Sequence, residues 1–127
     1  MSVLIDTHTF LWFINDSDQL SEVARSLLQS DLDLWISSAS LWEIAIKISV
    51  NKLTFPDPFS DFLAMQLKVN EIEILMPTIA HFELVSKLPL HHRDPFDRLL
   101  IAQATTEGIP IVSIDKAFDA YDVQRLW

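Results

Sequence analysis

Four acidic residues stand where a folded chain could bring them together to do chemistry. Asp6 ends a short apolar run near the N-terminus, and Asp115 ends a similar run near the C-terminus. Glu43 and Asp97 each lie near the start of a segment with the apolar periodicity of a helix. Carboxylates that share one pocket bind hard divalent cations such as Mg²⁺ or Mn²⁺ through their oxygens. Whether these four meet depends on the elements that carry them.

Those elements alternate between strand and helix along the chain. Short apolar runs predict strands at Val3 to Ile5, Leu34 to Ile36, Ile72 to Met76, Ile109 to Ile114 and Val123 to Trp127. Helical periodicity predicts helices at Ser21 to Leu28, Leu41 to Val50, Phe59 to Val69, Ile79 to Ser86 and Pro95 to Glu107, with another starting near His8. This alternation predicts an α/β fold, a three-layer α/β/α sandwich around a mostly parallel central sheet.

Length and composition predict a single globular domain spanning residues 1–127. The chain has 127 residues, half of them apolar, with four Trp and eight Phe, which is enough for one core and leaves no visible linker. It has no cysteine, so thiolate chemistry and disulfides are excluded. No signal peptide and no apolar run of about 20 residues is present. We therefore predict a cytoplasmic protein that does not contact a membrane.

The charge is strongly acidic. Nine Lys and Arg against eighteen Asp and Glu give a formal net charge of -9. This sign argues against a protein that binds nucleic acid mainly by neutralising phosphates. It remains compatible with an enzyme in which bound divalent cations reverse the local field, and it suggests a basic partner protein.

A parallel sheet would place the acids at one edge, because sites in such sheets form beyond the carboxyl ends of the strands. Asp6 and Asp115 belong to that edge directly, and Glu43 follows the second strand. Asp97 reaches it only if the preceding loop, Leu88 to Arg93, folds back. Two carboxylates about 4 Å apart repel by about 4 kcal/mol at an effective dielectric constant near 20, so the cluster requires a counter-charge. We expect Mg²⁺ or Mn²⁺ to supply it, with Asp6 and Asp97 as direct ligands.

Three of the four acids also have a simpler interpretation. Ser40 and Glu43 match a capping box, and Glu43 could pair with Lys47. In the second helix start, Asp94 is a natural N-cap before Pro95, which leaves Asp97 free.

Asp6 could instead form a turn with the amides of Thr7 or His8, and Asp115 could start the terminal turn. The remaining histidines are expected to have no direct role: His91 and His92 as an exposed loop pair, and His81 at a helix surface or core edge. The apolar stripes of the first helix and of Phe59 to Leu67 fit the core, or alternatively a dimer face.

Taken together, the motifs resemble a known family. The segments LIDTHTFLW, SASLWEIAIK, HHRDPFDRLLIAQA and IPIVSID are similar, in order and spacing, to the motifs of PIN-domain ribonucleases of the VapC type, the toxins of toxin-antitoxin pairs. The resemblance implies a PIN fold, a Mg²⁺- or Mn²⁺-dependent endoribonuclease acting on RNA, a homodimer, and inhibition by a small basic VapB-type antitoxin. It also implies that Asp6, Glu43, Asp97 and Asp115 are the catalytic, metal-binding acids.

Three further residues are expected to contact substrate. Ser113 occupies the position beside the fourth acid where the family often has Ser or Thr. Arg93 and Arg98 are candidate phosphate contacts on their charge alone.

Two other functions remain open from the residues themselves. An aspartyl-phosphate phosphatase also has acids at strand ends, but its pattern requires a second Asp where this chain has His8. A non-enzymatic acidic module could simply bind a basic partner through the same carboxylates.

Overall fold

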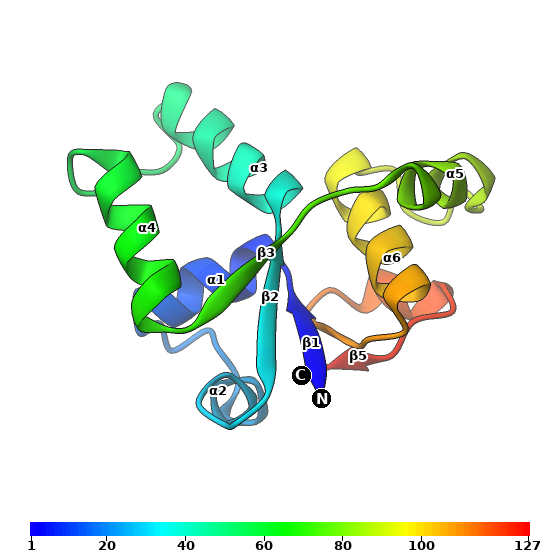
Figure 1. The fold of residues 1–127 in the computed structure, drawn as a ribbon, viewed down its shortest axis with the longest axis horizontal. Coiled ribbons are helices and arrows are strands. Elements are labelled where there is room, and N and C mark those ends of the chain that lie inside the picture. Colours follow the sequence, from blue (N-terminus) through cyan, green and yellow to red (C-terminus); the bar gives the residue numbers. More distant parts are fainter.

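The computed structural model describes residues 1–127 and contains a five-stranded parallel sheet with six α-helices around it (Figure 1). The strands are β1 (Ser2–Ile5), β2 (Asp33–Ser37), β3 (Ile72–Leu75), β4 (Ile111–Val112) and β5 (Arg125–Leu126). The helices are α1 (Thr7–Ile14), α2 (Glu22–Leu28), α3 (Ser38–Ser49), α4 (Phe59–Val69), α5 (Ile79–Lys87), α6 (Pro95–Glu107) and the short 3₁₀ helix η1 (Lys116–Ala120). The predicted three-layer α/β/α sandwich is confirmed.

The sheet order is β3-β2-β1-β4-β5, and every neighbouring pair is parallel. Strand β1 lies in the middle, with Leu4 opposite Trp35 of β2 on one side and Ile111 of β4 on the other. All strand ends therefore point the same way, and the residue that follows β1 lies at the centre of the carboxyl edge.

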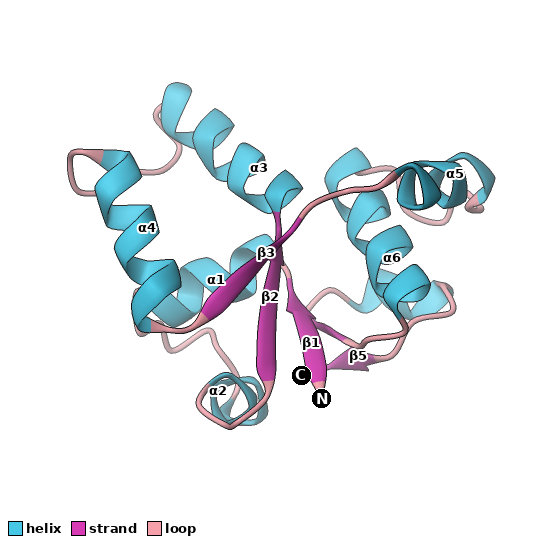
Figure 2. Ribbon diagram, in the orientation of Figure 1, coloured by secondary structure: helices cyan, strands magenta, loops and turns pink.

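Helices cover both faces of the sheet, α1 to α4 on one side and α5 and α6 on the other (Figure 2). Side chains of β1 alternate between the two faces, as the pleat requires. Val3 and Ile5 pack with α1 to α3, whereas Leu4 packs with Leu100 and Ile101 of α6. No helix of the chain combines the length and the apolar character needed to cross a bilayer.

The two aromatic stripes face the interior. Phe10 and Leu11 of α1 are buried in the first core, and Phe13 and Ile14 pack against it. From α4, the side chains of Phe59, Leu63 and Leu67 reach the same core. Both stripes thus contribute to the core, as predicted, although no side chain of α4 is fully buried.

Helix α3 begins earlier than its apolar periodicity predicted. Its N-cap is Ser37, whose hydroxyl accepts a hydrogen bond from the amide of Ala39 at 3.1 Å. Ser40 is thus inside the helix, and the predicted capping box of Ser40 and Glu43 is wrong. The reason is that β2 passes into α3 without a loop, so the first available hydroxyl takes the cap.

Two strands are shorter than predicted. Only Ile111 and Val112 of the run from Ile109 to Ile114 pair as β4, and β5 has two residues as well. Pro110 has no amide hydrogen with which to extend the ladder. Helix α6 ends as predicted at Gly108, whose φ of 67° lies in the left-handed region that glycine adopts without strain.

Candidate active site

Asp6 lies at the carboxyl end of the central strand. It is the N-cap of α1, and its carboxylate accepts the amide hydrogen of Thr9 at 2.9 Å. The predicted turn therefore exists, with Thr9 as donor in place of Thr7 or His8. Only 5 % of the residue is exposed, and this burial raises the pKa of Asp6 above its usual value, against hydrogen bonds from Ser113 and Thr9.

Ser113 connects the first and fourth acids. Its hydroxyl lies at Asp6 and accepts the amide hydrogen of Asp115 at 3.0 Å. The side chain is fully buried, so it cannot touch RNA. Ser113 therefore does not contact the substrate as expected. Its hydroxyl instead supports both Asp6 and Asp115.

Glu43 lies in the second turn of α3 and has two partners. The hydroxyl of Thr7 donates to Glu43 Oε1 at 2.7 Å, and Lys47 Nζ lies 3.4 Å from Glu43 Oε2, as the i,i+4 spacing predicted. Thr7 was not recognised in the sequence, although it directly follows Asp6. It fixes the carboxylate of α3 to the start of α1, across 36 residues of chain.

The start of α6 carries two acids with different roles. Asp94 is the predicted N-cap, accepting from the amides of Phe96 at 2.9 Å and Asp97 at 3.4 Å. Asp97 is left free of capping. Burial raises the pKa of Asp97 to about 7. The negative charges of Asp94, Asp6 and Glu43 act on this pKa in the same direction.

Arg98 belongs to the scaffold of the site. Its guanidinium donates to the carbonyl oxygens of Val85, Leu88, Pro89 and His92 at 3.0 to 3.3 Å. These bonds hold the end of α5 and the following loop against α6. The expectation that Arg98 contacts a phosphate is therefore wrong, because all of these donor bonds are directed inward. The same loop folds back as Asp97 requires.

His92 is the residue that the sequence interpretation missed. It is only partly exposed, and its Nε2 lies 3.0 Å from Asp97 Oδ2 and 3.1 Å from Asp115 Oδ2. Asp115 also caps η1, accepting from the amide of Ala117 at 2.9 Å. The expected exposed loop pair is wrong for His92, whereas His91 is exposed. The adjacent acidic motif was the only signal in the sequence.

This cluster does not include His8, His81 or Arg93. His8 is exposed and its ring lies 5.7 Å from that of Trp12. His81 is 1 % exposed, deeper than the helix surface or core edge expected for it, because its Nδ1 accepts the amide hydrogen of Thr78 and caps α5. Arg93 is exposed at the end of the loop, where its charge remains available.

The structure thus brings all four predicted acids to one edge of the sheet. Asp6 meets Asp115 through Ser113, Asp97 meets Asp115 through His92, and Glu43 acts electrostatically on Asp97. Ligand atoms of His92, Asp97 and Asp115 lie within 4.8 Å of one another.

These closely spaced carboxylates, with raised pKa values for Asp6 and Asp97, fit a divalent cation. The positive charge of the ion would offset the burial and the mutual repulsion that disfavour the charged carboxylates. The cluster can therefore hold a divalent metal ion.

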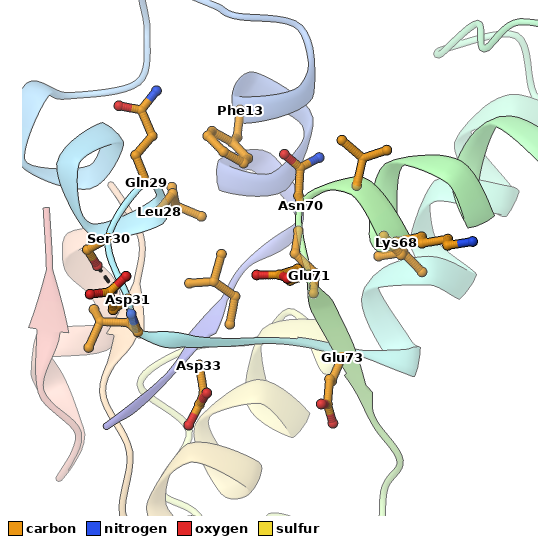
Figure 3. A pocket seen from close by; sticks show the side chains of 15 residues that line it. Phe13, Leu28, Gln29, Ser30, Asp31, Asp33, Lys68, Asn70, Glu71 and Glu73 are labelled. Atoms are coloured by element: carbon orange, nitrogen blue, oxygen red, sulfur yellow. Dashed lines mark hydrogen bonds between the residues drawn. The ribbon is translucent and has the colours of Figure 1, made fainter.

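A hollow on the surface lies away from the acids. It has a volume of about 890 Å³ and is lined by residues 28–34 and 67–73 together with Phe13 (Figure 3). These segments lead into β2 and β3 and include the first two residues of each strand, so the hollow is at the amino edge of the sheet, opposite the acids. Concavity alone would have pointed to the wrong edge.

A comparison with protein-family models matches residues 3–124 to the PIN domain. The chain belongs to the PIN domain family. No curated protein sequence matches the chain. The family assignment agrees with the resemblance of the four motifs to PIN domains.

Solved structures share the fold of this PIN domain at low sequence identity. VapBC2 from Rickettsia felis, bound to a DNA fragment from its promoter, matches with a TM-score of 0.73 at 16% identity, covering 100% of both chains. FitAcB from Neisseria gonorrhoeae matches with a TM-score of 0.69 at 18% identity, covering 97% of this chain and 95% of the other. DNA-bound VapBC from Salmonella typhimurium gives 0.66 at 17%, covering 98% and 96%.

Proposed function

We propose that this PIN domain is a metal-dependent endoribonuclease and the toxin of a toxin-antitoxin pair. The observation that carries the proposal is the convergence of Asp6, Glu43, Asp97 and Asp115 at one sheet edge, with raised pKa values for Asp6 and Asp97. PIN-family membership and the similarity of the fold to VapBC and FitAcB chains support it.

The proposed chemistry is hydrolysis of an RNA phosphodiester. When bound, Mg²⁺ or Mn²⁺ supplies Lewis acidity at the phosphate and lowers the pKa of water. Asp6 and Asp97 would hold the ion directly, and Glu43 and Asp115 would hold a second ion or orient a metal-bound water. Thr7 holds the carboxylate of Glu43, and Ser113 holds that of Asp6 together with the backbone amide of Asp115. Arg93, exposed beside the cluster, is the proposed phosphate contact.

The proposed partners follow from charge and from the similar structures. A small basic VapB-type antitoxin would complement the formal charge of -9, and its basic segment would compete with RNA or metal at the acids. We also propose a homodimer, as in the family that the motifs resemble.

Single-residue variants of the two central acids test the proposal. We expect Asp6→Asn and Asp97→Asn each to abolish Mn²⁺-dependent cleavage of single-stranded RNA, because each removes a charged ligand of nearly unchanged shape. The matched control is Asp18→Asn, a change to an exposed acid outside the cluster, which should retain wild-type cleavage.

The assay is cleavage of a labelled RNA with and without EDTA, and far-UV circular dichroism checks the fold. Full activity in either site variant would remove that residue from the mechanism. If the wild-type protein, free of contaminating nuclease, binds a basic peptide but cleaves no RNA, the acidic binding module is favoured instead.

A further inference from the structure

His92 is placed inside the acid cluster although the proposed chemistry does not use it. Its Nε2 lies between Asp97 Oδ2 and Asp115 Oδ2, at 3.0 and 3.1 Å, two oxygens that the proposed function assigns to metal. An imidazole in that position is either a metal ligand or a hydrogen-bond donor. The two roles require different tautomers, so the surroundings of the ring decide between them.

The position of His92 is fixed from four sides. Its amide donates to the hydroxyl oxygen of Tyr121 at 2.7 Å, and its carbonyl accepts from Arg98 at 3.3 Å. The Tyr121 hydroxyl itself donates to the carbonyl of Pro89 at 2.7 Å, so the loop is tied at two points. The ring lies 5.9 Å from that of Phe118. This ring is therefore held at the cluster by the scaffold.

The tautomer of His92 is set by the start of α6. The amide of Asp94 donates to His92 Nδ1 at 3.2 Å, so Nδ1 presents a lone pair and the single ring hydrogen is on Nε2. That hydrogen points at the two carboxylates. For Nε2 to bind a metal, the hydrogen would move to Nδ1 and oppose the Asp94 amide. The geometry thus disfavours His92 as a ligand.

The Nε2–H group and a cation compete for the same oxygens. Mg²⁺ or Mn²⁺ would lie about 2.1 Å from each carboxylate oxygen that binds it. An ion shared by the two Oδ2 atoms would stand against the positive end of the N–H bond. The ion and the N–H group cannot both be accommodated, because each would occupy the same space between the two oxygens.

We propose that His92 is an internal placeholder for the metal ion. In the metal-free protein, its Nε2–H joins the carboxylates of Asp97 and Asp115. The ion displaces it on binding, so His92 stabilises the free protein and weakens metal binding. It is a positioning residue that sets metal affinity, and this inference rests on the metal site of the proposed function.

Calorimetric titration of the full chain with Mn²⁺ tests the placeholder through affinity, without any assay of activity. Removing a competing hydrogen bond worth about 1 kcal/mol should make His92→Ala bind Mn²⁺ about three- to tenfold more tightly than wild type. His92→Gln is the matched control, since its amide nitrogen can reach the Nε2 position and donate. We expect its affinity to stay within about twofold of wild type, on the same conversion.

Melting in EDTA provides the second measurement. His92→Ala should melt about 3 to 6 °C below wild type, because it leaves two facing carboxylates without their shared donor. His92→Gln should recover most of that loss. His92→Asn, whose shorter side chain reaches only the Nδ1 position, should behave like His92→Ala in both measurements.

Several outcomes overturn the placeholder. Weaker Mn²⁺ binding by both His92→Ala and His92→Gln identifies a metal ligand. Equal affinities for wild type and His92→Ala show that the ion does not displace the ring. Tighter binding by His92→Gln, equal to that of His92→Ala, shows that the effect does not come from the donor at the Nε2 position, which Gln would have kept. If wild type binds no Mn²⁺ at all, the proposed function fails together with the placeholder, whereas the first three outcomes leave the metal site standing.

Discussion

At the scale of the residue, the main feature of the site is that several negative charges lie close together and partly buried. Asp97 lies at the mouth of α6 near Asp94, Asp6 and Glu43, and its burial raises its pKa to about 7. The chain offers partial compensation through the pairing of Lys47 with Glu43 and through the donor of His92. A cation that binds the deprotonated form would complete that compensation.

The raised pKa of Asp97 predicts a pH-dependent stability of the metal-free protein. The folded pKa of about 7 lies above the ordinary value of 3.8, so the folded state binds the proton more tightly than the unfolded state. The resulting stabilisation is fully present below about pH 4 and is lost as the pH rises through about 7.

Between about pH 5 and 8, the free energy of unfolding should fall by about 1 to 2 kcal/mol from this group, after allowance for its partial exposure. Urea unfolding in EDTA at both pH values measures it. In Asp97→Asn, which cannot titrate, the fall should be smaller by that amount. An equal fall in the two proteins would contradict the assignment.

At the scale of the element, the first turn of α6 assigns different roles to its two acids: Asp94 caps the helix, and Asp97 belongs to the acid cluster. Asp94 caps the helix and Pro95 follows it at the first helical position, where its missing amide hydrogen costs nothing. Asp97 is consequently free to face the other acids. The loop before α6 is tied down by Arg98 and Tyr121, which brings His92 to the same place.

Two variants of Asp94 should separate its capping from its charge. Asp94→Ala removes the acceptor for two amides and should lower the free energy of unfolding by about 1 kcal/mol. Asp94→Asn keeps a capping oxygen and should cost less. Because the charge of Asp94 raises the pKa of Asp97, both variants should lower that pKa, which carboxyl-detected NMR titration measures. An Asp97 pKa that is unchanged in Asp94→Asn would refute the electrostatic coupling.

At the scale of the whole molecule, the parallel sheet is what joins the distant segments. Strands β1 and β4 end beside each other, so Asp6 and Ser113 meet although 107 positions separate them in the sequence. Helices α3 and α6 then approach this edge from opposite faces of the sheet (Figure 1). A ligand bound at the edge would touch both layers and would therefore stabilise the entire domain.

Divalent cations should accordingly raise the melting temperature of the protein. A ligand that binds only the folded state stabilises it, by about 2.7 kcal/mol at a concentration of 100 times its Kd. We expect the increase with millimolar Mg²⁺ or Mn²⁺ in wild type and little of it in Asp6→Asn, with Asp18→Asn as the control for nonspecific charge. A wild-type melting curve that does not move across the titration would count against a metal site.

Local patterns in the sequence were sufficient for the fold and for the choice of the four candidate acids. Apolar runs and helical periodicity predicted the sandwich, because the spacing of apolar residues in each element shows which face is buried. The caps at Asp94 and Gly108 were predicted for the same reason, since a cap is made by neighbours in the chain. The start of α3 was misplaced because three serines offer a cap there and β2 passes into the helix without a loop.

Only the tertiary structure decided what surrounds the acids. The hydrogen bond of Thr7 to Glu43 spans 36 residues, and the contact of His92 with Asp115 spans 23. It also decided that Arg98 and Ser113 turn inward while Arg93 remains exposed. No local pattern encodes these contacts, because they depend on how a parallel sheet aligns strands from opposite ends of the chain. The physical reason is that composition determines which groups carry charge, whereas the distances between those groups are determined by packing alone.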